Sequence, residues 1–595
     1  MAESKRSAIW EFFIEIDGGR RAKCAECSAT LSRGGTGKAA TNSGMINHLK
    51  QHSEAHRIYR ESEATRKATK PAAQPTIQES FSGSFRWEEN SVKAKEITKT
   101  IAEMLVLDLQ PISMVQDEGF LRLMAKLQPK YKVPSRKHFT SVVLPEMFEK
   151  CKKSIKDALP QNGGYMSFTT DIWSSPNNKA VISLTAHWYE EKCSNMQHAI
   201  LNTSEFPGSH TGERIGLKMH EMLSAWNIST SQVHLILRDN AANMLKGLND
   251  AELPNVGCFI HTLQLVVLEG LECQKTVKDA IAKSRNIVTH FNHSPLACNK
   301  LSEIQDKYDL PKRKLLQDVR TRWNSSFYML ERMLDQRSTV TYYAGEVPTV
   351  KNLTEYEWNI TSRLLELLSP FEEITRIVSS DESNISEVIP YVAALRLFLE
   401  KNSSNHKGVE PTKETLLRSL NARFNYILEE NVFTFATVLD PRFKLNFISE
   451  NNHRILIDRI VTEILDQIEV TKPDETRPEL EKPAETSSGF WKCFEEVGAN
   501  QQQTIDPSIC TIRNELEQYL SGKNIDRKQS PYAWWTTNKH KYPHVLKIAT
   551  RYLSAPASTV VSERLFSTEG LIYEQHRNRL LPENGEMLTC MKRNF

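Results

Sequence analysis

Apolar and polar positions divide the chain into a strand-rich segment with helix-rich segments on both sides. Within residues 164–271, short apolar and β-branched runs predict five strands: 165–170, 180–189, about 198–206, 232–238 and 256–260. Helical spacing over 211–226 separates the third strand from the fourth, a further helix begins after residue 240, and another covers 261–271. Three strands, a helix, a strand, a helix and a strand predict a mixed α/β sheet.

Apolar positions three and four residues apart dominate outside this segment. Upstream they predict helices over about 91–109, 114–127 and 138–158. Downstream they predict amphipathic helices over 277–291, 358–378, 386–401, 413–429 and 453–469, with a Pro-rich loop at 471–489. The stretch 272–540 is too long for a loop, so it predicts an inserted helical domain.

Two of the predicted strands end in carboxylates. Asp171 comes where the first strand runs out, before a Ser-Ser-Pro-Asn-Asn turn, and Asp239 closes the fourth strand. If these strands are adjacent and parallel, both carboxylates lie at one edge of the sheet, where acidic pairs hold divalent metals. Taken alone, Asp171 is better explained as a turn residue.

The N-terminal region has metal-ligand spacing. Cys24 and Cys27 are followed by His48 and His52 in the pattern C-x2-C-x20-H-x3-H, which can close a tetrahedron around zinc. Met45 and Leu49 are expected to face inward from a helix. The apolar residues expected to pack over the site are Ile9, Trp10, Phe12, Phe13, Ile14 and Leu31. A unit of about 50 residues needs such a metal to fold.

Composition excludes a secreted or membrane-spanning class. The 595 residues carry a net charge of +3, with 39% hydrophobic and 25% charged residues, as in globular proteins. The ten cysteines are scattered, and no apolar run approaches 18 residues, so we expect a reducing compartment and no membrane. Residues 311–314, Pro-Lys-Arg-Lys, resemble a nuclear import signal, although such short basic runs are also common at helix starts.

Charge is concentrated locally in two regions. Residues 1–70 hold thirteen Lys and Arg against eight Asp and Glu, and residues 130–156 hold eight against two. Such an excess suits a polyanion, although a solvated helix face is an equally good reading of either region alone.

Five short motifs occur in an order that resembles hAT-superfamily DNA transposases and the proteins descended from them. They are Thr170-Asp171-Ile172-Trp173-Ser174, Asp239-Asn240-Ala241-Ala242-Asn243-Met244, Cys258-x-x-His261, Arg322-Trp323-Asn324-Ser325 and Ser562-Glu563-Arg564-Leu565-Phe566-Ser567. The N-terminal unit, about residues 7–58, resembles a BED-type zinc finger. The resemblance extends from residue 7 to the end of the chain.

The resemblance implies a fold class and a division of the chain. The fold is multidomain α/β, with an RNase H-like mixed sheet interrupted by a large all-helical insertion and preceded by a small zinc finger. The implied parts are a BED finger (1–58), a flexible linker (59–84), a helical DNA-binding or intertwining unit (85–160), the first part of the core (161–271), the helical insertion (272–540), and the second part of the core with the dimerisation segment (541–595).

The resemblance also implies cofactors, partners and site residues. Asp171, Asp239 and Glu563 would bind magnesium or manganese and carry metal-assisted phosphodiester hydrolysis and strand transfer. Structural zinc would sit on Cys24, Cys27, His48 and His52. The partners would be double-stranded DNA and a second copy or higher homo-oligomer, in the nucleus. The basic candidates for DNA contact are Arg20, Arg21, Lys23, Arg33, Lys38, Lys50, Lys130, Lys132, Arg136, Lys137 and Arg322.

Three positions have more than one interpretation. Trp323 is either a core aromatic or, by resemblance, a ring that stacks on a flipped base. Cys258 and His261 are two potential metal ligands, but a structural or DNA-orienting role is preferred because only two are present. Arg238 departs from the family pattern, where a small or polar residue precedes the second Asp, and a cation there could pair with a carboxylate or contact DNA.

Two hypotheses of function follow. The first is a hAT-type transposase that cleaves and transfers DNA at transposon ends. The second is a domesticated DNA-binding transcription regulator without catalysis, in which the core serves as scaffold. A metal-dependent nuclease acting elsewhere is a weaker third hypothesis because of the BED-like finger.

Overall fold

The computed structural model describes residues 7–35, 40–68, 86–160, 164–174, 179–401, 406–470, 507–565 and 580–594. The chain forms two compact units. One comprises residues 1–94 and 123–132, and the other comprises 95–122 and 133–595. Each unit is considered by itself below.

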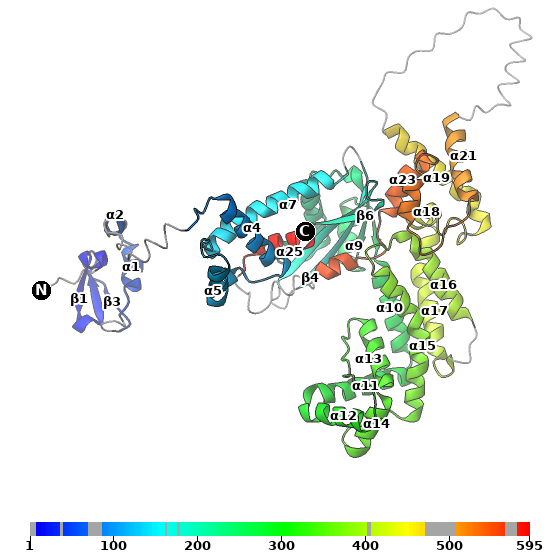
Figure 1. The fold of residues 1–595 in the computed structure, drawn as a ribbon, viewed down its shortest axis with the longest axis horizontal. Helices are drawn as coiled ribbons and strands as arrows, with labels where there is room; N and C mark the ends of the chain where they lie inside the picture. The colour runs from blue at the N-terminus through cyan, green and yellow to red at the C-terminus, as the bar shows by residue number, and fades with distance from the viewer. Residues whose placement is uncertain are drawn as a thin grey trace, which may run out of the picture. The chain divides into compact units, whose positions relative to one another are not determined.

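The N-terminal finger is a small antiparallel sheet covered by helices (Figure 1). β1 (Phe13–Ile16), β2 (Arg21–Cys24) and β3 (Thr30–Ser32) pair in sequence order, and α1 (Ser43–Leu49) and α2 (Ser53–Ala68) follow. Met45 and Leu49 are buried as expected, together with Ile9 and Phe13. Ile14 is 62% exposed, because it alternates with Phe13 along β1, so the expected packing of Ile14 over the site is wrong.

Helix α2 corrects the start of the expected linker. Residues 59–68 continue this helix, whereas the composition of 59–84 predicts an unstructured linker throughout. The first helical turns persist because Ala55 packs into the finger core and Arg57 pairs with Glu54 and Glu61 on the exposed face. Residues 69–85 lie outside the described parts of the chain.

The region before the sheet is helical, as its apolar spacing predicts. Its helices are α4 (Val92–Leu107), α5 (Glu118–Leu127), α6 (Arg136–His138) and α7 (Leu144–Ala158). A π-helical turn over Phe139–Val143 joins α6 to α7. The hydroxyl of Ser135 caps α6 by accepting a hydrogen bond from the backbone N–H of His138, at 3.3 Å.

A mixed five-stranded sheet lies between α7 and the helical insertion along the chain (Figure 1). The strands are β4 (Met166–Ser174), β5 (Ala180–Glu190), β6 (Asn195–Glu205), β7 (Val233–Arg238) and β8 (Asn255–Gly257), in the spatial order β6-β5-β4-β7-β8. β4 pairs antiparallel with β5 and parallel with β7. The predicted mixed α/β core is therefore confirmed.

The length of β4 corrects the expected position of Asp171. β4 continues to Ser174 because Ile172 and Trp173 still pair with β5, so Asp171 lies inside the strand opposite Ser183 and not in a turn. The last predicted strand is also shorter than expected. β8 ends at Gly257, and α10 begins at Phe259.

Two helices, α8 (Gly212–Ala225) and α9 (Ala242–Asp250), pack closely through their glycines. α8 connects β6 to β7, and α9 connects β7 to β8. A Cβ atom on Gly247 would lie 2.6 Å from the carbonyl oxygen of Gly212 and 2.9 Å from Cβ of Ile215. Both neighbours are backbone or close to it, so neither can move aside without separating the helices.

We therefore expect Gly247→Ala to destabilise the core by about 1–3 kcal/mol, the usual cost of overpacking. Chemical unfolding followed by circular dichroism measures the change. Gly345→Ala is the matched control, since nothing lies within 4 Å of its added methyl in α14 (Arg337–Glu346). Equal effects of the two substitutions would contradict this account of the contact.

The insertion is mostly helical, as expected. Its helices are α10 (Phe259–Cys273), α11 (Lys275–His293), α12 (Pro295–Lys307), α13 (Trp323–Asp335), α14, α15 (Glu355–Val378), α16 (Val388–Glu400), α17 (Glu410–Phe424), α18 (Asn431–Leu439), α19 (Glu450–Val470), α21 (Pro507–Ser521) and α22 (Pro531–Thr537). α10 packs against both α15 and α17. One core runs from Leu235 in β7 through Leu263 in α10 to Leu364 in α15. The expected loop at 471–489 lies outside the described residues.

The C-terminal part of the chain returns to the sheet. α23 (Pro543–Leu553) precedes a helical segment at 560–565 that carries Glu563, and α25 (Pro582–Asn594) packs on β6. The amide of Asn594 donates to the carbonyl of Ile200 at 3.0 Å, and the amide of Asn202 donates to Glu586 at 3.2 Å. These contacts, about 390 positions apart in sequence, make the chain's two distant parts one core.

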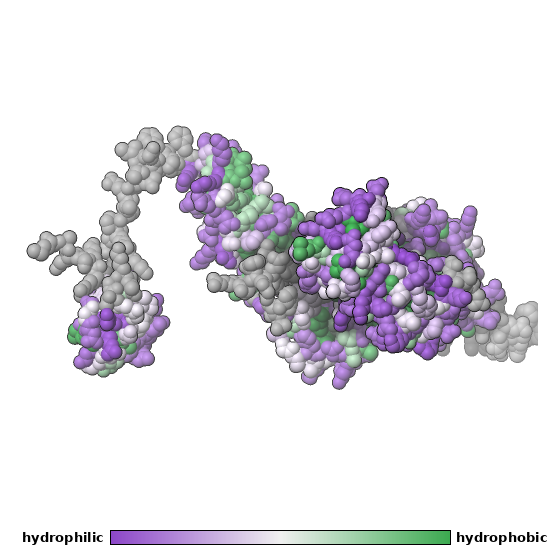
Figure 2. Space-filling view, turned by 90° about the horizontal axis from the view of Figure 1, so that it is seen from below, coloured by the Kyte–Doolittle hydropathy of each residue, from purple (hydrophilic) through white to green (hydrophobic). Residues whose placement is uncertain are grey.

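The described surface is mainly hydrophilic. Figure 2 shows hydrophilic residues over most of the visible face, with hydrophobic residues in small patches between them. Among the described helices, none combines the length and the apolar character needed to cross a membrane.

Candidate metal and nucleic-acid sites

Parallel pairing of β4 with β7 sets the two strand carboxylates level with each other. Thr169 pairs with Leu237. Asp171 lies two residues further along β4, and Asp239 lies two residues beyond Leu237, directly after β7 ends at Arg238. Asp171 is 8% exposed and accepts a hydrogen bond from the backbone N–H of Ile172 at 2.8 Å. Asp239 is half-buried and accepts from the backbone N–H of Ala241 at 3.2 Å.

The environment of Asp171 opposes its ionisation. Burial raises the pKa of its carboxyl to about 7, and the neighbouring charges of Asp239 and Glu563 act in the same direction. The positive charge of His261 opposes the shift. A buried carboxylate beside two other carboxylates is the arrangement that a divalent cation stabilises, because the cation supplies the missing countercharge.

Three contacts dock the segment that carries Glu563 on the sheet. The hydroxyls of Ser562 and Thr169 lie 3.0 Å apart in the core, and the side chain of Leu565 is buried against Ile200 with Trp173 beside it. These contacts bring Glu563 over β4, more than 300 positions from Asp239 in sequence. The prediction that Glu563 lies on a helix late in the chain is confirmed.

Two cations hold the Glu563 carboxylate. Nε2 of His261 lies 3.4 Å from it, and the guanidinium of Arg322 lies 3.6 Å away. Asp171, His261, Arg322 and Glu563 all line one open pocket. The structure therefore brings Asp171 and Glu563 together with His261, for which a structural or DNA-orienting role is expected, and with Arg322, for which DNA contact is expected.

His261 and Cys258 form one unit at the start of α10. Burial works against a charged imidazole, but the hydrogen bond to Cys258 and the charges of Cys258, Glu563 and Asp171 raise the pKa of His261 to about 9. The sulfur of Cys258 also accepts from the backbone N–H of Thr559 at 3.3 Å, which ties α10 to the segment that leads to Glu563. The position of Cys258 fits the structural interpretation, whereas His261 faces the pocket. The Cys-x-x-His spacing in the sequence already marks both residues as candidates for this site.

Arg238 braces the backbone beside Asp239. Its Nε donates to Asn255 at 2.8 Å and its Nη1 donates to the carbonyl oxygen of Asp239 at 2.8 Å. Asn255 donates in turn to Asn249 and to the carbonyl of Leu253. The guanidinium thus links β7, β8 and the end of α9.

Trp323 lies in the core of the insertion. Its side chain is 1% exposed and packs edge-to-face on Phe327, with ring centroids 6.2 Å apart. The ring offers no open face to a base in this position, so base stacking is not compatible with the structure, and the core interpretation fits it. Its neighbour Arg322 is exposed in the pocket.

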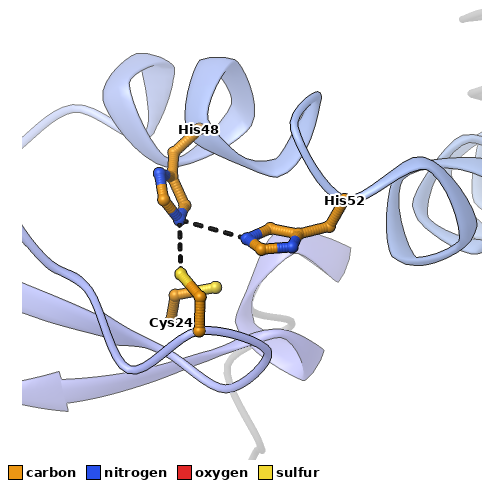
Figure 3. A group of neighbouring side chains, drawn as sticks. Cys24, His48 and His52 are labelled. Carbon is orange, nitrogen blue, oxygen red and sulfur yellow. Dashed lines mark hydrogen bonds between the residues drawn. The ribbon is translucent and has the colours of Figure 1, made fainter.

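The four predicted zinc ligands of the finger converge, and Figure 3 shows three of them, Cys24, His48 and His52, pointing toward one another. The ligand atoms of Cys24, Cys27, His48 and His52 lie within 4.8 Å of one another, and the sulfur of Cys27 is 3.1 Å from Nε2 of His48. Cys24 ends β2, His48 lies on α1, and His52 lies in the turn after α1 and not on that helix. Two sulfurs and two imidazoles at this separation fit tetrahedral zinc.

Such a close group of ligand atoms occurs only at the finger among the described residues. Asp171, Asp239 and Glu563 do not form such a close group, and Glu563 is instead paired with His261 and Arg322. Their all-oxygen donor set nonetheless fits magnesium or manganese.

Most expected DNA-contacting residues are exposed. They are Arg20, Arg21, Lys23, Lys50, Lys130, Lys132, Arg136 and Lys137. Arg33 is an exception, since its guanidinium donates to the carbonyl of Gly19 at 2.8 Å and stacks over Trp10, so its expected role as a phosphate contact is not compatible with this position. Lys38 lies outside the described residues.

Family models match three parts of the chain. The hAT family C-terminal dimerisation region matches residues 515–595. The ZBED1 RNase-like domain matches residues 169–251, and the ZBED1 RNase-like helical domain matches residues 256–367.

Curated relatives include both transposases and BED-domain proteins. Zinc finger BED domain-containing protein 4 of Homo sapiens is 29% identical over 99% of this chain and 52% of its own length. Zinc finger BED domain-containing protein RICESLEEPER 2 of Oryza sativa subsp. japonica is 24% identical over 99% of this chain and 88% of its own length. Putative AC transposase of Zea mays is 24% identical over 82% of this chain and 64% of its own length.

The chain spans about half the length of the human BED-domain proteins it matches. The matched dimerisation region and RNase-like domain point to the same group of proteins as the names of the relatives. The Cys and His cluster of the finger fits the BED zinc fingers that several of these relatives are named for. The chain therefore carries a hAT C-terminal dimerisation region and RNase-like domains of the ZBED1 type, and the relatives it resembles include transposases and BED-domain proteins.

Proposed function

We propose that the chain is a nuclear hAT-type transposase that binds DNA through its finger and cleaves it at transposon ends. The observation that carries the proposal is the placement of Asp171 on β4 and of Asp239 directly after the adjacent parallel strand β7, with the segment of Glu563 docked on β4. Burial that raises the pKa of Asp171 supports it further, because perturbed carboxylates cluster at functional sites.

Asp171, Asp239 and Glu563 would hold the cations, which supply charge stabilisation and an activated nucleophile when bound. The chain's own residues prepare this site. Arg238 fixes the backbone of Asp239, and the hydroxyls of Ser562 and Thr169 fix the segment of Glu563. His261 and Arg322 hold the Glu563 carboxylate at the pocket wall, and Arg322 is exposed for contact with a phosphate.

DNA binding and dimer formation complete the proposal. Zinc on the finger would orient its exposed basic face toward phosphates, as expected for Arg20, Arg21 and Lys23. The C-terminal region would join two copies. Nuclear localisation follows from the nature of the relatives and from DNA as the partner.

A cleavage assay tests the proposal. The full chain is incubated with Mg²⁺ or Mn²⁺ and with duplexes from the sequences that flank its coding region, as candidate transposon ends. We expect nicking by the wild type and a loss of at least about a thousandfold in Asp171→Asn, since metal ligands act in the transition state. Asp250→Asn, an exposed acid of α9, is the control.

A domesticated regulator is the second candidate. It is favoured by the ion pairs that engage Glu563 with His261 and Arg322 and by a relative named as a putative transcriptional regulator in Talaromyces stipitatus. Zinc-dependent, sequence-specific binding without nicking by the wild type would establish this candidate and exclude the first.

A further inference from the structure

A segment of the insertion carries five basic residues and one acid. Residues 311–322, here the basic strap, connect α12 to α13 and contain Lys312, Arg313, Lys314, Arg320 and Arg322. The strap contains neither helix nor strand. An irregular segment of this length inside a helical domain needs other contacts to fix its backbone.

Side chains from the helices behind the strap provide those contacts. Each donates a hydrogen bond to a carbonyl oxygen of the strap: Gln336 to Pro311 (3.1 Å), Gln305 to Arg313 (3.1 Å), Arg332 to Lys314 (2.8 Å), Ser325 to Val319 (2.9 Å) and Gln264 to Thr321 (2.7 Å). These bonds run from α10, α12 and α13 and the start of α14, so the strap's backbone is held along its whole length.

The strap's one acid points inward and is neutralised. Asp318 is buried, and its carboxylate accepts from Arg285 at 2.6 Å and from the hydroxyl of Ser326 at 2.9 Å. Leu315 is the strap's other buried anchor. With Asp318 neutralised by Arg285, the outward face of the strap keeps its five positive charges.

All five basic side chains lie on the exposed face. Lys312 pairs with Asp306 at 2.5 Å and Arg313 with Asp335 at 3.3 Å, but both cations remain more than half exposed. Exposed pairs of this kind are worth little, so a phosphate can replace the carboxylate at small cost. Lys314 and Arg320 are exposed as well.

The strap ends at the carboxylate pocket. Thr321 and Arg322 line that pocket together with Asp171 and Glu563. A polyanion that follows the strap from Lys312 is therefore led to the site where the proposed cleavage takes place.

We propose that the basic strap binds the phosphate backbone of the DNA that enters the carboxylate pocket. The inference rests on the proposed function and adds a DNA-binding surface outside the finger. The alternative for residues 311–314 is recognition by a nuclear import receptor. Two features favour DNA: the positive charge continues past the four-residue run to Arg320 and Arg322, and the backbone is fixed instead of being free for capture as a peptide.

The salt dependence of DNA binding tests the proposal. In the full chain, Lys312, Lys314 and Arg320 are replaced by Gln, and binding to a fluorescent random-sequence duplex is measured across salt concentrations by anisotropy. Each lost phosphate contact lowers the slope of log K against log[salt] by about 0.9, so we expect a decrease of about 2–3. The control replaces Lys278, Lys351 and Lys407, which are exposed residues of the same insertion. Circular dichroism checks the fold of both variants.

An unchanged slope in a folded strap variant would overturn the proposal. If nuclear accumulation were also lost, the segment would be an import signal. A reduced slope with no cleavage by the wild type would keep the strap and reject catalysis. Cleavage that depends on Asp171, together with an unchanged slope, would keep the catalytic proposal and reject the role of the strap.

Discussion

Asp171→Asn is expected to unfold at a higher temperature than the wild type at pH 8 in the presence of EDTA. The carboxylate is 8% exposed, and burial with the nearby Asp239 and Glu563 raises its pKa from 3.8 to about 7. Ionisation of this carboxyl therefore costs more free energy in the folded state than in the unfolded state, so at pH 8, where it is ionised in both states, it destabilises the fold. The neutral amide removes this cost, while the same substitution removes a candidate metal ligand.

The pH dependence of this effect has a defined sign. Below pH 4 the wild-type carboxyl is protonated in both states and carries no penalty. The penalty grows as the pH rises from about 4 to 7 and is constant above that, where a difference of about three pKa units corresponds to roughly 4 kcal/mol. The advantage of Asp171→Asn should therefore be small at pH 5 and largest at pH 8.

Thermal unfolding followed by tryptophan fluorescence between pH 5 and pH 8 measures the effect. Asp250→Asn, an exposed acid at the end of α9, controls for loss of a negative charge. A variant that is less stable than the wild type at every pH would show that Asp171 is held in its ionised form, contrary to the geometry described above.

Removal of zinc is expected to unfold the finger and to abolish sequence-specific DNA binding, with the core left intact. The finger's core is limited to a few side chains such as Ile9, Phe13, Met45 and Leu49, which is too little to fold a unit of this size. Structural zinc contributes on the order of 10–16 kcal/mol in comparable fingers. The stabilisation lost with the zinc is therefore larger than the stabilisation that the remaining contacts of the finger provide.

Limited proteolysis of the full chain before and after chelation measures this loss. We expect new cleavage within residues 7–58 and unchanged resistance of the core, and the same result for Cys24→Ser without chelator. Cys193→Ser, at an exposed free cysteine, is the control. A finger that stays resistant in Cys24→Ser would contradict the zinc assignment.

Periodicity predicted the elements of the core because their apolar residues are buried on regular faces. The mixed sheet, the helical insertion and the hAT relationship are confirmed, as is the helical setting of Glu563. Asp171 was placed at a strand end because a Ser- and Pro-rich stretch follows it. Pairing with β5 carries the strand on to Ser174, which is a tertiary effect that local sequence does not contain.

The details of the candidate site depend on contacts between distant residues. The partnership of His261 and Arg322 with Glu563 joins positions about 240–300 residues apart, and no spacing rule relates them. Trp323 illustrates the opposite problem, since its motif allows either a core ring or a base-stacking ring, and only its packing against Phe327 selects the first. Arg238 likewise finds its partner, Asn255, on a neighbouring strand.

A metal-specificity switch at Asp171 tests the central claim most directly. The full chain and Asp171→Cys are assayed for DNA nicking with Mg²⁺ and with Mn²⁺. Magnesium requires oxygen ligands, whereas manganese accepts sulfur more readily. The account predicts that Asp171→Cys is inactive with Mg²⁺ and regains nicking with Mn²⁺. Nicking by this variant that is equal to the wild type with Mg²⁺, or a folded variant that stays inactive with Mn²⁺ while the wild type cleaves with both, would contradict a metal site built on Asp171.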